Sequence, residues 1–529
     1  MAGALCALLL PSISGSTGAA RSGGVFRVTF LTTPGNFDHV DPALAYSRES
    51  WALLDTVCAR LMRYRDRPPP QGYQLVPEVA TAPPVVSRDG KTWTFRLRKG
   101  FRFSDGSPVR ADAFAQAIHR TMAPGVDSPA YLYTQAIVGA GDVHAGRAAR
   151  ASGVTARDYA LTVRFTREVR EFAQWTTMPF FCAVPPALPP SPEGVRTFPG
   201  AGPYTIREYR PNQRIVLGRN RYYGGRRAHH VDGFLVDLSA ESPDEKIKRV
   251  ATERADWTYT LPAVALQGHL GLIDKFGLNY SRFFITPGLT ISMYVLNSSG
   301  PLFRNNPQLR RAVNLALDRG RLLRTGAGDA TDQYLPPNVL GFKQRTIYPA
   351  RDLDRARALA SGNLRAGKAV LYVPDIPVAR GSAQGVQLQL ADLGLEIEIR
   401  PFGEHATASS YLGRLGIADE PWDLALVLWT PDFVDPAAYI NRLLDGQHAG
   451  GTNLAHFDES PFSALMQQAS RLQGGARAKA YAELDLRLAR DAAPLAPIAV
   501  FHEATLVSGR VGCMLRRPGL VLTTVCLKQ

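Results

Sequence analysis

The sequence predicts an α/β protein built from several lobes, and three observations support this. The chain has 529 residues, and at about 150 residues per domain such a length predicts roughly two to four lobes. Strand patterns and helix patterns alternate along the chain, which is typical of α/β proteins. Hydrophobic residues make up 45% and charged residues 20%, an ordinary composition for a folded protein, so we expect no wholesale disorder.

Residues 1–20 have the pattern of an export signal. The stretch from Ala2 to Ile13 is mostly apolar, and Gly18-Ala19-Ala20 fits a small-residue cleavage site. The apolar run is too short to span a bilayer. No Lys or Arg precedes the run, and Leu5 before Cys6 does not fit a lipoprotein cysteine. We therefore expect an exported protein, periplasmic or associated with the cell envelope, on the outer face of the cytoplasmic membrane.

The net charge of +15, from 61 Lys and Arg against 46 Asp and Glu, raises the question of nucleic-acid binding. The arginines, however, are scattered through strands, helices and loops rather than gathered on one basic helix. Zinc-finger spacing and the aromatic signature of RNA-binding motifs are both absent from the sequence. We therefore expect no nucleic-acid partner.

The first elements follow from alternation and turn chemistry. Residues 24–30 alternate as a strand, and residues 51–61 have helical spacing. Asp89-Gly90 predicts a hairpin turn, which leads into a strand over 93–98 with one apolar and one polar face. A helical stripe over 114–122 comes next.

The later elements alternate in the same way. A turn–strand–turn–strand pattern covers 200–220, and a strand over 291–296 precedes a helix capped by Asn306 with Pro307 at its first position. The remaining predictions are helices over 352–360, 386–393, 465–472 and 480–488, and strands over 395–399 and 494–500.

The segment from Trp422 to Pro436 is the most informative in the chain. Its continuous apolar run, Leu424 to Trp429, predicts a strand buried on both faces. The strand leads into a loop that carries two carboxylates, Asp432 and Asp435. A buried strand that delivers an aromatic ring and a carboxylate to one point is suited to bind a cationic ligand group.

This W-x-x-D-x-x-D-P pattern resembles a signature of the family 5 solute-binding proteins of ABC transporters, the dipeptide- and oligopeptide-binding receptors. Three further segments are similar to motifs of that family and occur in its order: 87–109, 200–220 and 296–319. One departure is Arg110, where relatives carry a Thr that caps the helix; the loss should cost about 1 kcal/mol.

The resemblance implies a two-lobed, periplasmic-binding-protein-like α/β fold with a two-strand hinge and an extra subdomain in the N-terminal half. The implied division is 1–20 signal peptide, 21–58 lobe I, 59–198 extra subdomain, 199–288 lobe I, 289–497 the ligand-binding lobe II, and 498–529 a C-terminal return to lobe I.

The resemblance also implies the binding residues. In peptide-binding relatives the first Asp of the motif pairs with the α-ammonium of the peptide, which assigns that role to Asp432; the alternative is a structural pair with an arginine. Asp435 is expected to be a turn or cap residue. The remaining predicted substrate-binding residues are Trp429, which could instead be core, Asn297, Tyr439, Tyr46 and Asp38.

No enzyme motif, metal-spaced histidine set or phosphate-binding glycine loop occurs in the sequence. We therefore expect a receptor that is not an enzyme, binds no cofactor or metal, is monomeric, and passes a peptide ligand to ABC-transporter permease subunits. The alternatives are a receptor for a non-peptide solute, such as a nickel chelate, an opine-like compound or a sugar, or a secreted hydrolase. His405, His448 and His456 keep the nickel alternative open.

Four cysteines remain after the predicted signal. Cys513 and Cys526 flank a Pro-Gly turn, which favours a disulfide in an exported chain; the alternative is two free thiols. Cys58 and Cys182 lie in apolar surroundings and are expected to be inert core residues.

Overall fold

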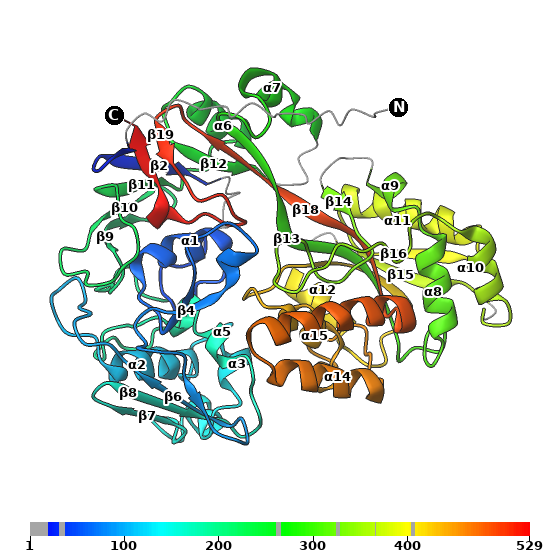
Figure 1. The fold of residues 1–529 in the computed structure, drawn as a ribbon, viewed down its shortest axis with the longest axis horizontal. Coiled ribbons are helices and arrows are strands. Elements are labelled where there is room, and N and C mark those ends of the chain that lie inside the picture. The colour runs from blue at the N-terminus through cyan, green and yellow to red at the C-terminus, as the bar shows by residue number, and fades with distance from the viewer. Residues whose placement is uncertain are drawn as a thin grey trace, which may run out of the picture.

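The computed structural model of the chain describes residues 20–30, 37–260, 266–323, 328–364, 367–403 and 408–528. The predicted export signal, apart from Ala20, lies outside these residues, as do Cys6 and His405. In Figure 1 lobe I lies at the upper left, the extra subdomain below it, and lobe II at the right. The predicted α/β alternation is confirmed, while the boundaries between the parts stay predictions.

One mixed sheet runs through both lobes in the order β16-β15-β17-β13-β18-β12-β2-β11-β10-β9, with β14 (Gly328–Ala330) paired to β18. Its two long strands are β13 (Phe283–Leu296) and β18 (Leu495–Val507), which are antiparallel to each other. β18 also pairs with β12 of lobe I, and β13 also pairs with β17 of lobe II. These two strands therefore connect the lobes, as the green and red-orange ribbons of Figure 1 show.

In lobe I, β2 (Val25–Thr29) lies at the centre and pairs in parallel with β11 (Gly233–Asp237) and β12 (Trp257–Thr260). β10 (Arg214–Arg219) and β9 (Tyr204–Arg210) extend this side of the sheet as antiparallel strands. The chain end returns here: β19 (Val511–Cys513) and β20 (Cys526–Lys528) form a small sheet with β1 (Ala20–Arg21). Leu527 then joins the core around β2.

The extra subdomain contains a four-stranded antiparallel sheet of β5 (Val85–Val86), β6 (Thr92–Arg96), β8 (Ala160–Arg164) and β7 (Val154–Arg157). Gly90, at φ 67°, makes the predicted turn between β5 and β6. The predicted helix is α2 (Ala111–Thr121), and Arg110 before it makes no side-chain cap bond. The short helices α3 (Tyr131–Thr134) and α5 (Phe172–Trp175) lie on the side that faces lobe II (Figure 1).

In lobe II, β17 (Leu424–Trp429) has the predicted bounds and lies between β13 and β15 (Ala369–Pro374), followed by β16 (Ile397–Phe402). The first four residues of β17 are buried, but Leu428 is 54% exposed and Trp429 is half-buried, so the prediction of a strand buried on both faces holds only for its first part. α8 (Pro307–Ala316) begins as predicted, because the Asn306 side chain accepts a bond from Leu309 N. The other main helices are α10 (Leu353–Ala360), α11 (Pro377–Ala391), α14 (Ser460–Arg471) and α15 (Gly474–Arg487).

Several predicted elements differ in their bounds; the helix predicted over 386–393, for example, is α11 and begins at Pro377, and the strand predicted over 494–500 is β18 and continues to Val507. For two further elements the reason can be identified. The helix predicted over 51–61 is α1 (Arg48–Val57), since the Ser47 side chain caps it at Ser50 N and Cys58 is already extended. The strand predicted over 291–296 begins at Phe283, because pairing with β18 continues to that residue. Long-range pairing of this kind leaves no local signal in the sequence.

The expectation that Cys58 and Cys182 are inert thiols is wrong: the structure joins them in a disulfide, with their Cα atoms 5.4 Å apart. The bond links the point where the chain leaves α1 to the segment that ends the subdomain's last helical turn, η2 (Pro179–Phe181). A disulfide is as apolar as a buried thiol, so apolar surroundings do not separate the two cases.

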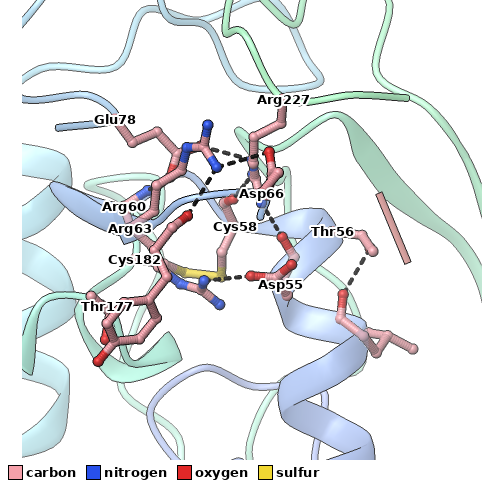
Figure 2. A network of polar contacts seen from close by, with 12 residues as sticks. Asp55, Thr56, Cys58, Arg60, Arg63, Asp66, Glu78, Thr177, Cys182 and Arg227 are labelled. Carbon is pink, nitrogen blue, oxygen red and sulfur yellow. Dashed lines mark hydrogen bonds and ion pairs between the residues drawn. A yellow bond between two sulfur atoms is a disulfide. The ribbon is translucent and has the colours of Figure 1, made fainter. Parts of the chain in front are cut away.

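A buried polar network surrounds this disulfide (Figure 2). Arg227 of lobe I forms an ion pair with Glu78 of the subdomain at 2.8 Å and donates to the backbone oxygens of Asp55 and Cys58. Arg60 pairs with the Asp55 side chain. Burial raises the pKa of Asp55, but the charges of Arg60 and Arg227 outweigh that effect and lower it. The network and the disulfide together fix the subdomain to lobe I.

Candidate functional site

The loop after β17 carries the predicted carboxylates into the contact between lobe II and the extra subdomain. Thr430 and Thr290, next to each other across β17 and β13, share a hydrogen bond of 2.7 Å between their hydroxyls. Phe433 is 2% exposed and packs into the core of the subdomain, with its ring 6.4 Å from that of Tyr133. Since Phe433 is anchored in this way, its neighbour Asp432 is held between the two parts.

Asp432 is half-buried and receives hydrogen bonds from the far side of this contact. Its Oδ1 accepts from the hydroxyl of Tyr46 at 2.9 Å, and its Oδ2 accepts from the hydroxyl of Tyr133. Among the described residues, no Lys, Arg or His nitrogen lies within 4.0 Å of it. The alternative, a structural ion pair between Asp432 and an arginine, is therefore not found among the described residues.

The two tyrosines stay hydrogen-bond donors at neutral pH. Burial, followed by the charge of Asp432, raises the pKa of the Tyr46 hydroxyl, and the same two causes raise the pKa of the Tyr133 hydroxyl well above its ordinary value. A carboxylate has about four lone-pair positions, so two donors leave room for a further donor. Among the described residues, Asp432 therefore has hydrogen-bond donors but no positively charged partner.

Asp38 organises the loop that presents Tyr46. Its carboxylate accepts from the backbone N–H groups of Tyr46 and Ser47 and from the hydroxyls of Ser47 and Ser50. The Tyr46 ring is stacked on that of Phe180, with centroids 6.2 Å apart. Of the predicted site residues, the structure thus brings Tyr46 to Asp432, while Asp38 acts on the shape of the loop.

Asp435 is a cap residue, in agreement with the sequence. Its side chain accepts from Ala437 N, and it forms a buried ion pair with Arg477 at 2.6 Å. Burial lowers the pKa of Arg477, but the adjacent Asp435 charge outweighs burial and raises it. Gln174 of the subdomain also donates to Asp435, at 3.1 Å. Because the Asp435 carboxylate is already paired with Arg477, we do not expect it to bind a charged group of the ligand.

The other three predicted residues make bonds within the protein. The side chain of Asn297 is buried, donates to Trp422 O and accepts from Ser299 and Gly300, so a ligand would have to displace these bonds. Tyr439 is fully buried and donates to Leu289 O. Trp429 is half-buried, packs beside the core of lobe II and donates to Ala438 O.

A cavity of about 750 Å³ lies between lobe II and the subdomain. Val434, Asp435 and Arg477 line it from lobe II, and Trp93 and Gln174 line it from the subdomain. Asp432 is not part of this lining, but it lies two residues before Val434. The volume is within the range of about 300–1,000 Å³ that ligand sites occupy.

Two residues near Asp432 were missed by the sequence reasoning. Tyr133 donates to Asp432 from α3, and Arg442, on α13 (Ile440–Leu444), has its guanidinium carbon 4.8 Å from the centre of the Tyr133 ring. Trp175 is the second ring beneath Arg442, at 5.9 Å. Neither residue carries a local pattern that could have found it.

Within the described ranges, no group of three or more His, Cys, Asp and Glu side chains could hold a metal ion. His456 lies against Leu415 O at 3.0 Å, and burial, followed by the charges of Arg442 and Arg167, lowers the pKa of His448 to about 3. Among all the residues that the structure describes, no helix is both long and apolar enough to cross a membrane.

Comparison with known proteins gives matches over most of the chain. Residues 74–451 match the family model described as bacterial extracellular solute-binding proteins, family 5 middle. The periplasmic oligopeptide-binding protein OppA of Salmonella typhimurium is 26% identical over 470 residues, which cover 82% of this chain and 81% of that protein.

Solved structures show the same fold. The clavulanic acid biosynthesis oligopeptide binding protein 2 superposes with a TM-score of 0.83 at 23% identity, over 97% of both chains. The periplasmic murein tripeptide binding protein MppA, in an unliganded open form, gives a TM-score of 0.74 at 20% identity, over 94% of this chain and 95% of that one. The predicted two-lobed, periplasmic-binding-protein-like fold is confirmed.

Proposed function

Since the chain belongs to the family 5 bacterial extracellular solute-binding proteins, we propose that it captures peptides between its lobes and delivers them to the membrane permease of an ABC importer. The peptide enters with a free N-terminus, and its α-ammonium group binds Asp432. The protein works outside the cytoplasmic membrane as a monomer and does not change its ligand chemically.

The single observation that carries this proposal is the state of Asp432. Its carboxylate is held by the hydroxyls of Tyr46 and Tyr133, and no cation pairs with it in the described residues. A carboxylate withdrawn from water is costly unless a positive charge and hydrogen bonds compensate it. A peptide ammonium supplies both, since it carries one charge and three donors.

The neighbouring carboxylate, Asp435, differs from Asp432 in having a cationic partner. Asp435 is three residues away in the same loop and has Arg477 as its cation. Within the described ranges, Asp435 thus has a cation at ion-pair distance and Asp432 has none. The names of the relatives point the same way, since OppA and MppA are described as binding an oligopeptide and a murein tripeptide.

The test is a comparison of ligand classes on the purified, full-length mature protein. We expect native mass spectrometry to recover retained peptides, and mixed-sequence peptide pools to raise the thermal unfolding midpoint. Ni²⁺, simple sugars and opine-like compounds should leave the midpoint unchanged. A shift with one of these and none with peptides would overturn the proposal, and so would cleavage of the peptides during incubation.

A further inference from the structure

A basic pocket of about 260 Å³ lies where the extra subdomain meets lobe I. One carboxylate, that of Glu78, and five cationic side chains line it; the cations are Arg63, Arg98, Lys99, Arg226 and Arg227. The other lining residues, such as Phe101, are apolar or glycine. A concave surface lined by charges of one sign concentrates ligands of the opposite sign, so this lining favours an anion.

The basic pocket is separate from the cavity between lobe II and the subdomain. Met62 of β3 (Met62–Tyr64) lines that cavity of about 750 Å³, whereas the next residue, Arg63, lines the basic pocket. Successive side chains of a strand point to opposite faces, which places the two hollows on opposite sides of β3. Because the basic pocket is lined by residues of the subdomain and lobe I, we expect its ligand to bind independently of the peptide.

Two of the five cations are paired with carboxylates. Arg227 forms its ion pair with Glu78 at 2.8 Å, and Arg63 forms one with Asp66 at 2.9 Å. The second oxygen of Glu78 accepts from Arg60 N at 3.0 Å. Figure 2 shows these residues together beside the disulfide. Burial lowers the pKa of Arg227, but the charge of Glu78 outweighs burial and raises it, so Arg227 stays protonated and the single carboxylate of the lining is already neutralised.

The other three cations, Arg98, Lys99 and Arg226, have no counter-charge within the described ranges. No carboxylate there lies at ion-pair distance from their side-chain nitrogens, and these nitrogens donate no hydrogen bond to the described residues. Lys99 has only the ring of Tyr159 nearby, 5.7 Å from its Nζ to the ring centre. Arg98 is half-buried, so its charge is less well screened by water than that of an exposed arginine. Like charges that line one pocket repel each other, and a bound anion would remove that cost.

The backbone holds the two segments that carry these cations against each other. Gly224 lies so close to Gly100 that an added Cβ would stand 2.8 Å from the Gly100 carbonyl oxygen. Tyr223 also packs edge-on against Phe101, with ring centroids 6.5 Å apart. The pocket is therefore formed by a fixed contact of two chain segments and not by the chance approach of long side chains.

We propose that this basic pocket binds a phosphate group, supplied either by the headgroup of an anionic phospholipid or by free phosphate. A phosphate monoester carries about 1.5–2 negative charges at pH 7, which three unpaired cations can neutralise. Guanidinium groups bind phosphate oxygens in pairs and an ammonium binds as a point charge, so Arg98, Arg226 and Lys99 can share the oxygens of one tetrahedral group. The volume is below the range of about 300–1,000 Å³ typical of larger ligands, which suits a single charged group.

The test on the full-length mature protein has two arms, both at constant ionic strength. Inorganic phosphate is titrated calorimetrically against a chloride control, and co-sedimentation is measured with phosphatidylcholine vesicles that do or do not contain phosphatidic acid. Calorimetric binding without sedimentation identifies free phosphate as the ligand. Sedimentation that depends on phosphatidic acid, and that inorganic phosphate competes away, identifies the headgroup. Binding in neither arm would overturn the proposal.

A chemical readout places the bound phosphate without any variant. The phosphate source that binds should slow acetylation of the Lys99 amine by an amine-reactive reagent, as measured by mass spectrometry. Lys91, an exposed lysine of the same subdomain, is the matched control and should be acetylated at an unchanged rate. Equal protection of the two lysines, or protection of neither, would refute the assignment to this pocket.

The variant Arg98→Gln with Arg226→Gln should weaken phosphate binding at least about tenfold, because each change removes hydrogen bonds from a charged donor. Peptide binding by this variant should equal that of the wild type. Arg88→Gln with Arg157→Gln removes the same charge from exposed positions of the subdomain and should leave phosphate binding unchanged. The proposal fails if both double variants lose affinity equally, or if Arg98→Gln with Arg226→Gln binds phosphate like the wild type.

Discussion

The hydroxyl of Tyr133 donates a hydrogen bond to Asp432, a residue 299 positions further along the chain. The bond joins a short helix of the extra subdomain to the loop after β17, and Tyr46 makes a second such bond from lobe I. The carboxylate that we propose as the ligand anchor is therefore also a contact between the parts of the molecule. Ligand binding and lobe closure should for this reason be linked.

Removing both hydroxyls should loosen this contact. Hydrogen bonds to a charged group contribute about 1.5–3 kcal/mol each, so Tyr46→Phe with Tyr133→Phe should shift the unliganded protein toward a more open form. Small-angle scattering should then give a larger radius of gyration than for the wild type, and addition of a peptide pool should reduce it. Tyr131→Phe, whose ring stacks on His144 within the subdomain, serves as the control. An unchanged radius in the double variant would contradict the link.

The Asp435–Arg477 pair should act on stability rather than on ligand recognition. Breaking one partner of a buried ion pair costs about 3–5 kcal/mol, so Asp435→Asn and Arg477→Gln should each lower the free energy of unfolding by that order. The double variant should lose less than the sum of the two. Chemical denaturation of all four proteins measures this. Strictly additive losses would show that the pair is not coupled.

His448 should make the protein less stable in acid. Its pKa is lowered to about 3 in the fold, whereas an unfolded chain protonates it at about 6.5. The unfolded state therefore binds more protons between these values, and the stabilising contribution of the neutral ring is present above pH 6.5 and lost as the pH falls toward 3.

The measurement is the free energy of unfolding of the wild type minus that of His448→Asn. This difference should decrease by about 1–3 kcal/mol between pH 7 and pH 4, after allowance for partial exposure of the ring. His230→Asn, at an exposed position, should show no such trend. A difference that is constant or increases in acid would contradict the prediction.

The two disulfides should differ in how much they stabilise the fold. In the chain-entropy model a loop of about 15 residues is worth about 3 kcal/mol and one of about 100 residues about 4.7 kcal/mol. Cys58–Cys182 closes 124 positions and Cys513–Cys526 closes 13. Paired alanine substitutions should therefore cost more at the first bond. Non-reducing peptide mapping checks the connectivity, and recovery of all four as free thiols would remove the basis of the comparison.

Local patterns in the sequence predicted much of the fold. The continuous apolar run in the segment from Trp422 to Pro436 predicted the strand that is β17, and Asn306 with Pro307 marked the start of α8. Such signals depend on neighbours in the chain, which is why they can be read without a structure. The full length of β13 could not be read, because pairing with β18 about 200 residues away extends it.

The residues of the candidate site were harder to predict from the sequence, because long-range contacts bring them together. Asp432 stands at the end of a recognisable strand, but Tyr133 and Arg442 reach it only through folding. The Cys58–Cys182 bond had one available signal: four cysteines remain after the predicted leader, and pairing Cys513 with Cys526 leaves two. The even number of cysteines favoured a second disulfide between Cys58 and Cys182, whereas their apolar surroundings suggested free thiols.

Calorimetric titration of Asp432→Ala with free and N-acetylated peptides tests the central claim most directly. Loss of one partner of a desolvated ion pair costs about 2–5 kcal/mol, or roughly 30- to several-thousand-fold in affinity. We predict that loss for Asp432→Ala with free peptides, a comparable loss for the wild type with acetylated peptides, and unchanged binding for Asp419→Ala, an exposed lobe II control. Equal binding of free and acetylated peptides by the wild type, or wild-type affinity in Asp432→Ala, would contradict the account.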